Sequence, residues 1–272
     1  MLRVGTSGWQ YRSWRGRFYP KQVAAARWLE HFAARFATVE VNNTFYRLPP
    51  RETFESWHAR VPDDFTIAVK ASRYLTHYKR LHEPADPVER LLDHAAGLGT
   101  SLGPVLLQLP PDLPVAVDRL DETLQAFGGR TRLAVEFRHA SWFIDEVREV
   151  LAARGAAMVL ADRDARPLTP MWRTADWCYV RFHAGTASPR PCYGRRALDS
   201  WTRRIRELWP DGDGYVYFNN DPEGCAVRDA IVFAHLAASS GTVVTRVPDL
   251  SEARVGQIGT SRTTSAGGLS VR

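Results

Sequence analysis

The chain has 272 residues, 44% hydrophobic and 24% charged, which is the composition of an ordinary globular protein with one large core or two modest ones. It contains no run of about 18 apolar residues, and its first segment, MLRVGTSGWQ, has no apolar stretch of signal-peptide length, so we expect a cytoplasmic protein without a membrane span. The formal net charge of +6 suits anionic partners but identifies none.

Eight apolar, strand-like segments recur along the chain, and helical patterns follow most of them. The segments are residues 2–6, 38–42, 66–70, 105–109, 133–137, 158–162, 178–183 and 215–219. Among the helical patterns, Pro20 opens the first, Ser141 caps one that Gly155 closes, and Asp221 with Pro222 starts the last. The connection after the sixth strand has no clear helical pattern, so we expect its helix to be short or missing.

Eight strands that alternate with helices fit a single (β/α)8 barrel of the TIM type, an α/β fold. We therefore predict one barrel domain over residues 1–241, with no internal domain boundary. An open α/β sheet is the alternative. Residues 242–272 are predicted to form a disordered tail, because most of this segment is rich in Ser, Thr and Gly and poor in apolar residues.

Cys178, Cys192 and Cys225 are an odd number of cysteines without a CxxC motif or a Cys/His spacing. The pattern predicts neither a disulfide framework nor a zinc site. We expect the cysteines to be reduced, and Cys192 to be a bystander rather than a nucleophile.

The period of two along each strand decides which side chains face the barrel interior. In residues 38–42 the valines Val39 and Val41 face the helices, which turns Glu40 and Asn42 inward. Seven strands carry an inward polar or charged residue near their carboxyl ends. These residues are Glu40, Asn42, Lys70, Gln108, Glu136, Arg138, Asp162, Arg181, His183 and Asn219.

Barrel interiors are normally filled with branched apolar side chains, and barrel enzymes place their chemistry at the carboxyl ends of the strands. Since unpaired buried charge is costly, we interpret the polar layer as the lining of a site. The alternative is a structural ion-pair network that closes the barrel mouth. It would set the acids Glu40, Glu136 and Asp162 against the cations Lys70, Arg138 and Arg181.

Lysine is scarce in this chain, with Lys21, Lys70 and Lys79 against 33 arginines. An inward lysine in such a background indicates that a compact ammonium group is needed. Lys70 could hold an oxyanion, donate a proton or form a Schiff base. It could equally be a lysine that simply pairs with Glu40 or Glu136.

The first loop interleaves aromatic residues with arginines, a pattern typical of surfaces that stack bases or sugars beside phosphates. It holds Trp9, Tyr11, Trp14, Phe18, Tyr19, Arg12, Arg15 and Arg17. Such aromatics also commonly pack a loop against a barrel. We expect Trp9 or Tyr11 to reach the pocket and Trp14 to lie in the core, and residues 184–194 could form a mobile lid.

Seven segments, in this order, resemble the domain-of-unknown-function family 72, also called the YecE-like family. They are GTSGWQYRSWRGRFYP, TVEVNNTFYRLP, VKASRYLTH, PVLLQLPP, AVEFRHASW, YVRFHAG and YFNND, and they cover about residues 2–240. The resemblance implies a TIM-type barrel and implies no reaction, because the activity of that family is not established. The pattern of the family falls on Gly5, Trp9, Tyr11, Glu40, Asn42, Phe45, Tyr46, Lys70, His77, Gln108, Glu136, Arg138, Trp142, Arg181, His183, Asn219 and Asn220.

Two carboxylates and a histidine supply candidates for a general acid and base, cations suit a phosphate, carboxylate or oxyanion, and amides suit sugar hydroxyls or a base edge. We therefore predict an anionic polyol or nucleotide-like substrate. The predicted catalytic residues are Glu40, Lys70, Glu136 and His183. The predicted substrate-binding residues are Trp9, Tyr11, Asn42, Tyr46, Gln108, Arg138, Asp162, Arg181 and Asn219.

A divalent metal is a weaker hypothesis, because three cations share the layer with its candidate ligands. Those ligands would be Glu40, Glu136, Asp162 and His183. We predict no metal and no other cofactor. The favoured function is a hydrolase of phosphoesters or glycosides, ahead of an isomerase, with Glu40 or Glu136 as the base. A nucleic-acid-binding protein or nuclease and a non-catalytic ligand-binding barrel are the alternatives.

Overall fold

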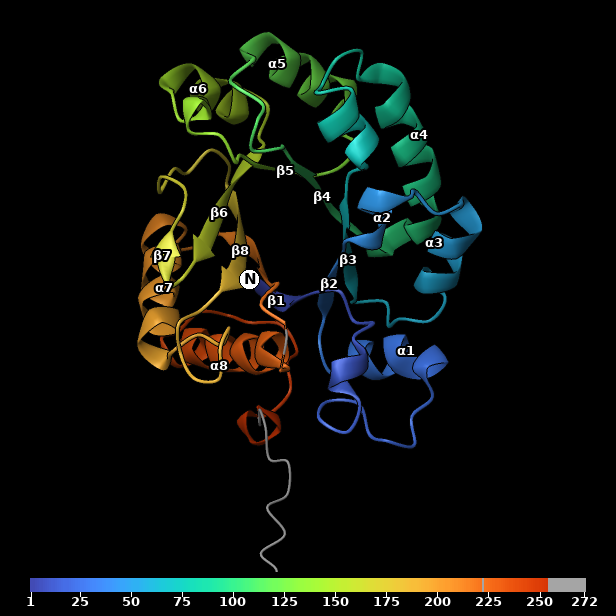
Figure 1. Cartoon of the computed structure of the whole chain (residues 1–272), viewed down its shortest axis with the longest axis vertical. Coiled ribbons are helices and arrows are strands. Elements are labelled where there is room, and N and C mark those ends of the chain that lie inside the picture. Colours follow the sequence, from blue (N-terminus) through green and yellow to red (C-terminus); the bar gives the residue numbers. More distant parts are fainter. Residues whose placement is uncertain (222, 254–272) are drawn as a thin grey trace, which may run out of the picture.

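The computed structural model describes residues 1–221 and 223–253, and its strands form a closed parallel barrel with helices around it (Figure 1). The strands pair in the order β5-β4-β3-β2-β1-β9-β8-β6, and pairing of β5 with β6 closes the ring. They are β1 (Leu2–Ser7), β2 (Thr38–Val41), β3 (Thr66–Lys70), β4 (Leu102–Gln108), β5 (Leu133–Glu136), β6 (Ala157–Arg163), β8 (Trp177–Ala184) and β9 (Asp213–Phe218). The predicted (β/α)8 barrel is confirmed, and closure excludes the open sheet.

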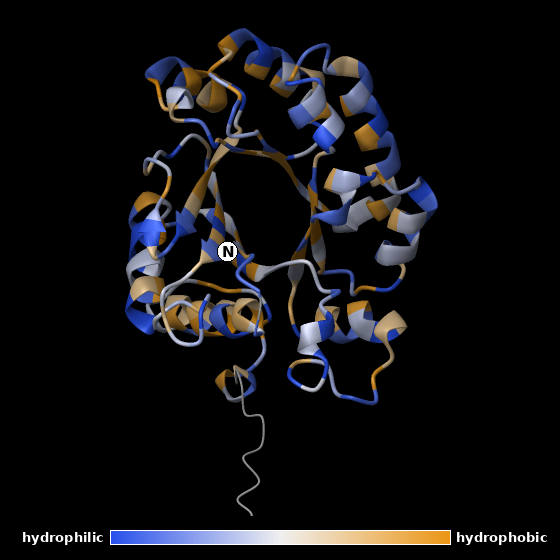
Figure 2. Cartoon of the chain, viewed as in Figure 1, coloured by the Kyte–Doolittle hydropathy of each residue, from blue (hydrophilic) through white to orange (hydrophobic). Residues whose placement is uncertain are grey.

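The helices lie outside the ring and cover the outer faces of the strands (Figure 1). They are α1 (Trp28–Ala33), α2 (Asn43–Tyr46), α3 (Arg51–His58), α4 (Ala85–Ala95), α5 (Val117–Ala126), α6 (Asp145–Ala153), α7 (Arg195–Leu208) and α8 (Cys225–Ser239). The short turns are η1 (Arg12–Trp14), η2 (Ala25–Arg27), η3 (Tyr74–Tyr78), η4 (Ala96–Ser101), η5 (Ala140–Trp142) and η6 (Leu250–Glu252). In Figure 2 the strands are mainly hydrophobic and the helices mix both kinds of residue, as expected of helices that are half exposed.

The connection after β6 has no helix, as predicted. The chain turns back at Asp164 and Ala165, both in the left-handed region with φ of 55° and 57°, and forms the short antiparallel strand β7 (Arg166–Pro167). Two successive left-handed residues are the geometry of a tight hairpin turn. The strand order therefore continues from β6 to β8 without an intervening helical layer.

Three helix beginnings differ from the prediction. The first helix begins at Trp28 rather than beside Pro20. Ser141 does not cap α6; its hydroxyl accepts a hydrogen bond from the Val115 amide at 2.8 Å. Asp221 accepts from the indole of Trp14 at 2.6 Å, α8 begins at Cys225, and Pro222 lies outside the described residues.

The barrel interior has its own apolar cluster, separate from the larger cluster between strands and helices. Its members are Ala68, Leu106, Ala134, Ala157, Val159, Trp177, Tyr179, Tyr215 and Tyr217. The aromatic residues come from β8 and β9 and replace the branched side chains usual in such barrels. The hydroxyl groups of Tyr179 and Tyr217 bond to Glu40 and Thr38, so the aromatic layer is joined to the polar layer next to it.

The chain continues to contact the barrel beyond the expected domain end at residue 241. Leu2 exchanges backbone hydrogen bonds with Val243 and Thr245, and Arg246 pairs with Asp64 at 2.8 Å. Residues 254–272, which hold most of the predicted tail, lie outside the described residues. In the described part of the chain, every helix is too short or too polar to cross a membrane.

Candidate functional site

Arg181 connects two carboxylates at the carboxyl ends of three strands. Its Nη1 atom lies 2.5 Å from Oε2 of Glu136 on β5, and its Nη2 atom lies 2.8 Å from Oε1 of Glu40 on β2. All three side chains are at most 1% exposed. Parallel strands end at the same mouth of a barrel, which explains how residues so distant in sequence meet here.

Glu40 is surrounded by hydrogen-bond donors. It accepts from the hydroxyl of Ser7 at 2.7 Å, that of Tyr179 at 2.6 Å and the amide of Asn42 at 3.2 Å, in addition to Arg181. Burial alone would raise the pKa of Glu40, but the charge of Arg181 and these hydrogen bonds lower it below the usual range. Glu40 is therefore ionised at neutral pH, which suits holding a cation better than accepting a proton.

Glu136 is engaged in the same way. Its Oε1 atom lies 2.5 Å from Nη2 of Arg138 and 3.0 Å from Nε2 of His183. Burial opposes ionisation, yet Arg181, His183 and Arg138 hold the pKa of Glu136 well below its usual range. Glu40, Glu136 and Arg181 thus form the predicted ion-pair network, and we call these three residues the floor of the site. The residues beside it, which include Arg138, Lys70 and Asn42, form the rim and are less completely paired.

His183 faces Glu136 with Nε2 and Asn219 with Nδ1. Nε2 lies 3.0 Å from Oε1 of Glu136 and 3.2 Å from Nη2 of Arg138, and the closer carboxylate favours the tautomer that carries its proton on Nε2. The Nδ1 atom is then an acceptor, with the amide of Asn219 at 3.5 Å. Burial, aided by the charges of Arg181 and Arg138, lowers the pKa of His183, so the ring is neutral at pH 7 and can accept a proton at Nδ1.

Lys70 lies at the end of β3 with 9% of its surface exposed. Its Nζ atom donates to Oε1 of Gln108 at 2.8 Å and lies 4.2 Å from the centre of the Phe45 ring. Among the described residues it forms no ion pair. Burial, followed by the charge of Arg181, lowers the pKa of Lys70 to about 8.

The polar layer carries unsatisfied polar atoms in both its floor and its rim. Within the described residues, Nε of Arg181 in the floor and Nε of Arg138 and Oδ1 of Asn42 in the rim are buried and have no hydrogen-bond partner. Buried polar groups are nearly always paired with protein, water or a ligand. Two donors and an acceptor beside His183 and Lys70 therefore indicate a place where a polar molecule binds.

Asp162 does not join the layer, and its predicted place in the site is wrong. Its carboxylate accepts from the hydroxyl of Tyr193 and the indole of Trp201, both at 2.8 Å, on the helical side of β6. Asp162 shares its strand face with Met158 and Leu160, so the period of two turns it outward. The layer keeps the cations Lys70, Arg138 and Arg181 against Glu40 and Glu136, a net charge of one positive unit with His183 neutral.

The four residues proposed as metal ligands do not come together, since Asp162 faces the helices and both glutamates are occupied by arginine. In the part of the chain that the structure describes, no group of three or more His, Cys, Asp or Glu side chains is arranged to hold a metal ion. The donor set at the mouth, with three cations in it, fits an anion better than a metal.

Of the two aromatic residues of the first loop that could reach the pocket, Tyr11 lies beside the site and Trp9 does not. Trp9 is buried and packs edge-on against Trp57 of α3 with ring centres 5.5 Å apart, away from the mouth. Tyr11 is half-buried and donates to the carbonyl of Ser7 at 2.5 Å, beside the carboxylate that Ser7 contacts. Trp14 is fully buried, as predicted.

Tyr46 lies on α2 with 67% of its surface exposed and is not part of the layer. It lines a groove of about 620 Å³ beside the mouth, between α2, η3 and α4, together with Leu48, Tyr74, Arg90 and His94. Of the predicted substrate-binding residues, most lie in or beside the layer at the mouth and Tyr46 lies in a neighbouring groove, whereas Trp9 and Asp162 pack elsewhere.

Ser7 and Tyr179, which both donate a hydrogen bond to Glu40, were absent from the predicted site. The alternation along the first strand would have turned Ser7 inward, and Tyr179 shares the inward face of its strand with Arg181 and His183. The strand pattern therefore contained the signal for both residues.

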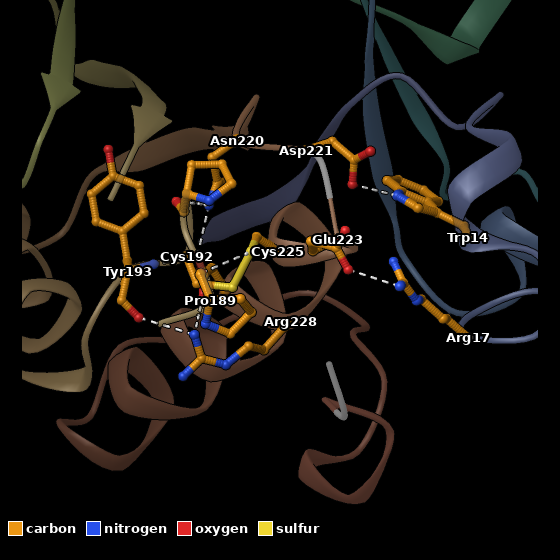
Figure 3. The surroundings of a disulfide bond; sticks show 12 residues. Trp14, Arg17, Pro189, Cys192, Tyr193, Asn220, Asp221, Glu223, Cys225 and Arg228 are labelled. Atoms are coloured by element: carbon orange, nitrogen blue, oxygen red, sulfur yellow. Dashed lines mark hydrogen bonds and ion pairs between the residues drawn. A yellow bond between two sulfur atoms is a disulfide. The ribbon is translucent and has the colours of Figure 1, made fainter. Parts of the chain in front are cut away.

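The loop after β8, which we expected to be a mobile lid, is tied to α8 by a disulfide bond between Cys192 and Cys225 (Figure 3). The prediction that these two cysteines are reduced is therefore wrong, and Cys178 is the free, buried thiol. The two cysteines are 33 residues apart and belong to no recognisable sequence motif, so their pairing becomes visible only in the folded structure. Asn220 adds a hydrogen bond to the carbonyl of Pro191 at 3.1 Å.

Known proteins resemble this chain along nearly its whole described length. A family model described as "Protein of unknown function DUF72" matches residues 3–252. The UPF0759 protein YunF of Bacillus subtilis (strain 168) is 25% identical over 262 residues, which covers 83% of this chain and 91% of that protein.

Solved structures of DUF72 family proteins also resemble this chain. A DUF72 family protein from Thermotoga maritima MSB8 has a TM-score of 0.77 and 28% identity, covering 88% of this chain and 99% of that one. A DUF72 family protein from Enterococcus faecalis V583 has a TM-score of 0.73 and 18% identity, covering 88% and 96%, and supports the fold alone.

Proposed function

This chain belongs to the DUF72 family of proteins of unknown function, and we propose that it is an enzyme that transfers protons on a small anionic substrate at the barrel mouth. His183 accepts the proton at Nδ1, Glu136 orients the ring through Nε2, and Arg138 binds the anionic group. The observation that carries the proposal is the neutral imidazole of His183, which contacts Glu136 through Nε2 and lies 3.2 Å from Arg138, whose buried Nε has no partner among the described residues.

The charge of the layer supports an anionic substrate. Lys70, Arg138 and Arg181 exceed the two glutamates by one positive charge, and an anion bound at the rim would balance it. The same charges argue against hydrolysis of glycosides by a pair of carboxyl groups. That reaction needs one protonated carboxyl group as the acid, whereas Arg181 favours the ionised form of both Glu40 and Glu136.

The test compares His183→Gln with the parent protein. Glutamine keeps a donor for Glu136 but has no nitrogen that can take up a proton, so the floor stays satisfied. The substrates are p-nitrophenyl phosphate, bis-p-nitrophenyl phosphate, and a set of keto acids and sugar phosphates in D₂O, whose deuterium uptake is followed by NMR. For any substrate that is turned over, we expect a loss of about 100-fold or more.

The pH dependence provides a second readout. Because burial lowers the pKa of His183, the ring stays an effective base at and somewhat below pH 6.5, and activity should fall only as the pH drops through this lowered value. His82→Asn, an exposed histidine outside the site, is the control and should keep full activity. Undiminished turnover in His183→Gln would contradict the proposal. Tight binding of an anion without turnover or exchange would favour the non-catalytic alternative.

A second candidate function, binding of single-stranded nucleic acid, is supported by one surface. Tyr46, Tyr74 and Tyr78 are 67%, 54% and 64% exposed, and the guanidinium of Arg73 lies 5.8 Å from the ring centre of Tyr46 and 5.3 Å from that of Tyr78. Exposed aromatic rings beside arginine are surfaces on which bases stack. This surface adjoins the groove next to the mouth, so a nucleotide-like substrate could use both.

A further inference from the structure

Lys70 is a buried amine with few partners for its charge. Among the described residues its Nζ atom has one hydrogen-bond acceptor, Oε1 of Gln108, and it lies 4.2 Å from the centre of the Phe45 ring, a cation–π contact. Gln108 also lies 3.5 Å from Nη1 of Arg181, so the single acceptor is shared with a second cation. An ammonium group with three donors is poorly served by this environment.

The other cations of the layer, Arg138 and Arg181, each contact a carboxylate directly. Arg181 lies between two carboxylates and Arg138 contacts one, while Lys79, on the surface, pairs with Glu83 at 2.7 Å. Lys70 is the cation of the floor and rim that lacks an ion pair within the described residues. Burial and the nearby charge of Arg181 therefore oppose the charged form of Lys70 without a direct carboxylate contact to offset them.

We propose that Lys70 is a nucleophile that forms an imine with an aldehyde or ketone carrying a carboxylate or phosphate group. This inference rests on the proposed function, because it uses the same mouth, the same anion-binding arginine and the same proton-transfer group. It also names the substrate class, an anionic carbonyl compound.

The step balances without a redox partner. The lone pair of the Lys70 nitrogen attacks the carbonyl carbon, a C–N bond forms, and the carbonyl oxygen takes up a proton to give a carbinolamine. The nitrogen loses one proton, and the hydroxyl group, protonated a second time, leaves as water to give the protonated imine, which becomes the neutral imine when the nitrogen gives up its remaining proton. His183 and Lys70 belong to one chain of contacts through Glu136, Arg181 and Gln108, and in this proposal His183 is the group that exchanges the protons.

The rim matches the rest of such a substrate. Arg138 offers an unpaired Nε donor for a carboxylate or phosphate oxygen, and Asn42 offers an unpaired Oδ1 acceptor for a hydroxyl group. The Phe45 ring next to Nζ limits access of water to the imine. A carbonyl group close to an anionic group, as in short keto acids and sugar phosphates, would reach the amine and the arginine together.

The scarcity of lysine makes the test direct. The full-length protein is incubated with glyoxylate, pyruvate or glyceraldehyde 3-phosphate and sodium cyanoborohydride, which reduces an imine to a stable secondary amine. Peptide mapping by mass spectrometry then reports Lys21, Lys70, Lys79 and the N-terminal amine separately. We expect at least a tenfold preference for Lys70 with one or more probes, and labelling that increases as the pH approaches 8.

Lys70→Arg should lose this adduct, while Lys21→Arg, a change at an exposed lysine, should keep it. Circular dichroism and the melting temperature verify that Lys70→Arg is folded; if it is not, Lys70→Met serves as the second variant. Equal labelling of all lysines, or no adduct at Lys70 with any of the three probes, would overturn the inference. If Lys70 is not labelled but His183→Gln abolishes turnover, the imine is wrong and the proposed acid–base function stands.

Discussion

Burying the charged amine of Lys70 lowers the free energy of unfolding, and this effect can be measured without a substrate. Its amine titrates near 10.5 when unfolded and at about 8 when folded, so the fold disfavours the charged form. The cost is complete below pH 8, shrinks between pH 8 and 10.5, and disappears above that.

We predict that Lys70→Met raises the free energy of unfolding by about 1–3 kcal/mol at pH 7 and that the gain fades towards pH 10.5. Urea denaturation at both pH values measures it. Lys21→Met, at an exposed lysine, should change stability by less than about 0.5 kcal/mol. A Lys70→Met variant that is less stable than the parent at pH 7 would show that the ammonium is a structural group.

The stability contributed by Glu40 and Glu136 depends on pH in the opposite direction to that of Lys70. Their folded pKa values lie below the ordinary value of 4.5, so their contribution to stability is present above pH 4.5 and is lost as the pH falls through the folded values. Acid therefore neutralises the carboxylates of Glu40 and Glu136, whereas mild alkali deprotonates the ammonium group of Lys70.

Among the elements, the loop after β8 is held by the disulfide bond between Cys192 and Cys225. A cross-link between residues 33 positions apart reduces the entropy of the unfolded chain, which is worth about 3–4 kcal/mol in the chain-entropy model. The loop follows His183 directly, so its attachment to α8 also affects the strand end that carries the proposed base.

We predict that Cys192→Ala with Cys225→Ala lowers the free energy of unfolding by up to about 3–4 kcal/mol. Dithiothreitol should destabilise the parent protein and leave the double variant unchanged. In urea without reductant, the parent should expose one titratable thiol, that of Cys178. Three reactive thiols in the unfolded parent would mean that the disulfide does not form.

The strand elements explain which predictions could be made from sequence. Alternation of valines with Glu40 is a local signal, and it correctly turned residues of six strands toward the mouth. It was misapplied at Asp162, which shares the face of Met158 and Leu160. The disulfide and the exposure of Tyr46 depend on loops whose paths the sequence does not determine locally, so no periodic pattern could have predicted them.

On the scale of the whole molecule, the excess of positive charge bears on the nucleic-acid alternative. The chain has a formal charge of +6, and the exposed tyrosine and arginine surface beside the mouth provides a place for bases to stack. Binding of this kind is weakened by salt because bound cations are released from the phosphates.

We predict that, if this surface binds nucleic acid, a fluorescent oligothymidylate will bind with an affinity that falls steeply between 50 and 200 mM salt, as is usual when several phosphates are contacted. Tyr46→Ala with Tyr78→Ala should weaken binding about tenfold or more, since stacking is worth about 1–3 kcal/mol per base. Phe143→Ala, on another part of the barrel, is the control. Binding that is absent, or insensitive to salt, excludes this function.

The separation between a permanently charged floor and a proton-exchanging rim has a consequence for how this protein can change. Glu40, Arg181 and Glu136 satisfy one another below the mouth, while Asn42, Gln108 and Asn219 stand above them and are half-buried. Asn42 donates to Glu40, and Gln108 accepts from Lys70 and Arg181, so a substitution at either amide would change the substrate contacts and the support of the charged groups together.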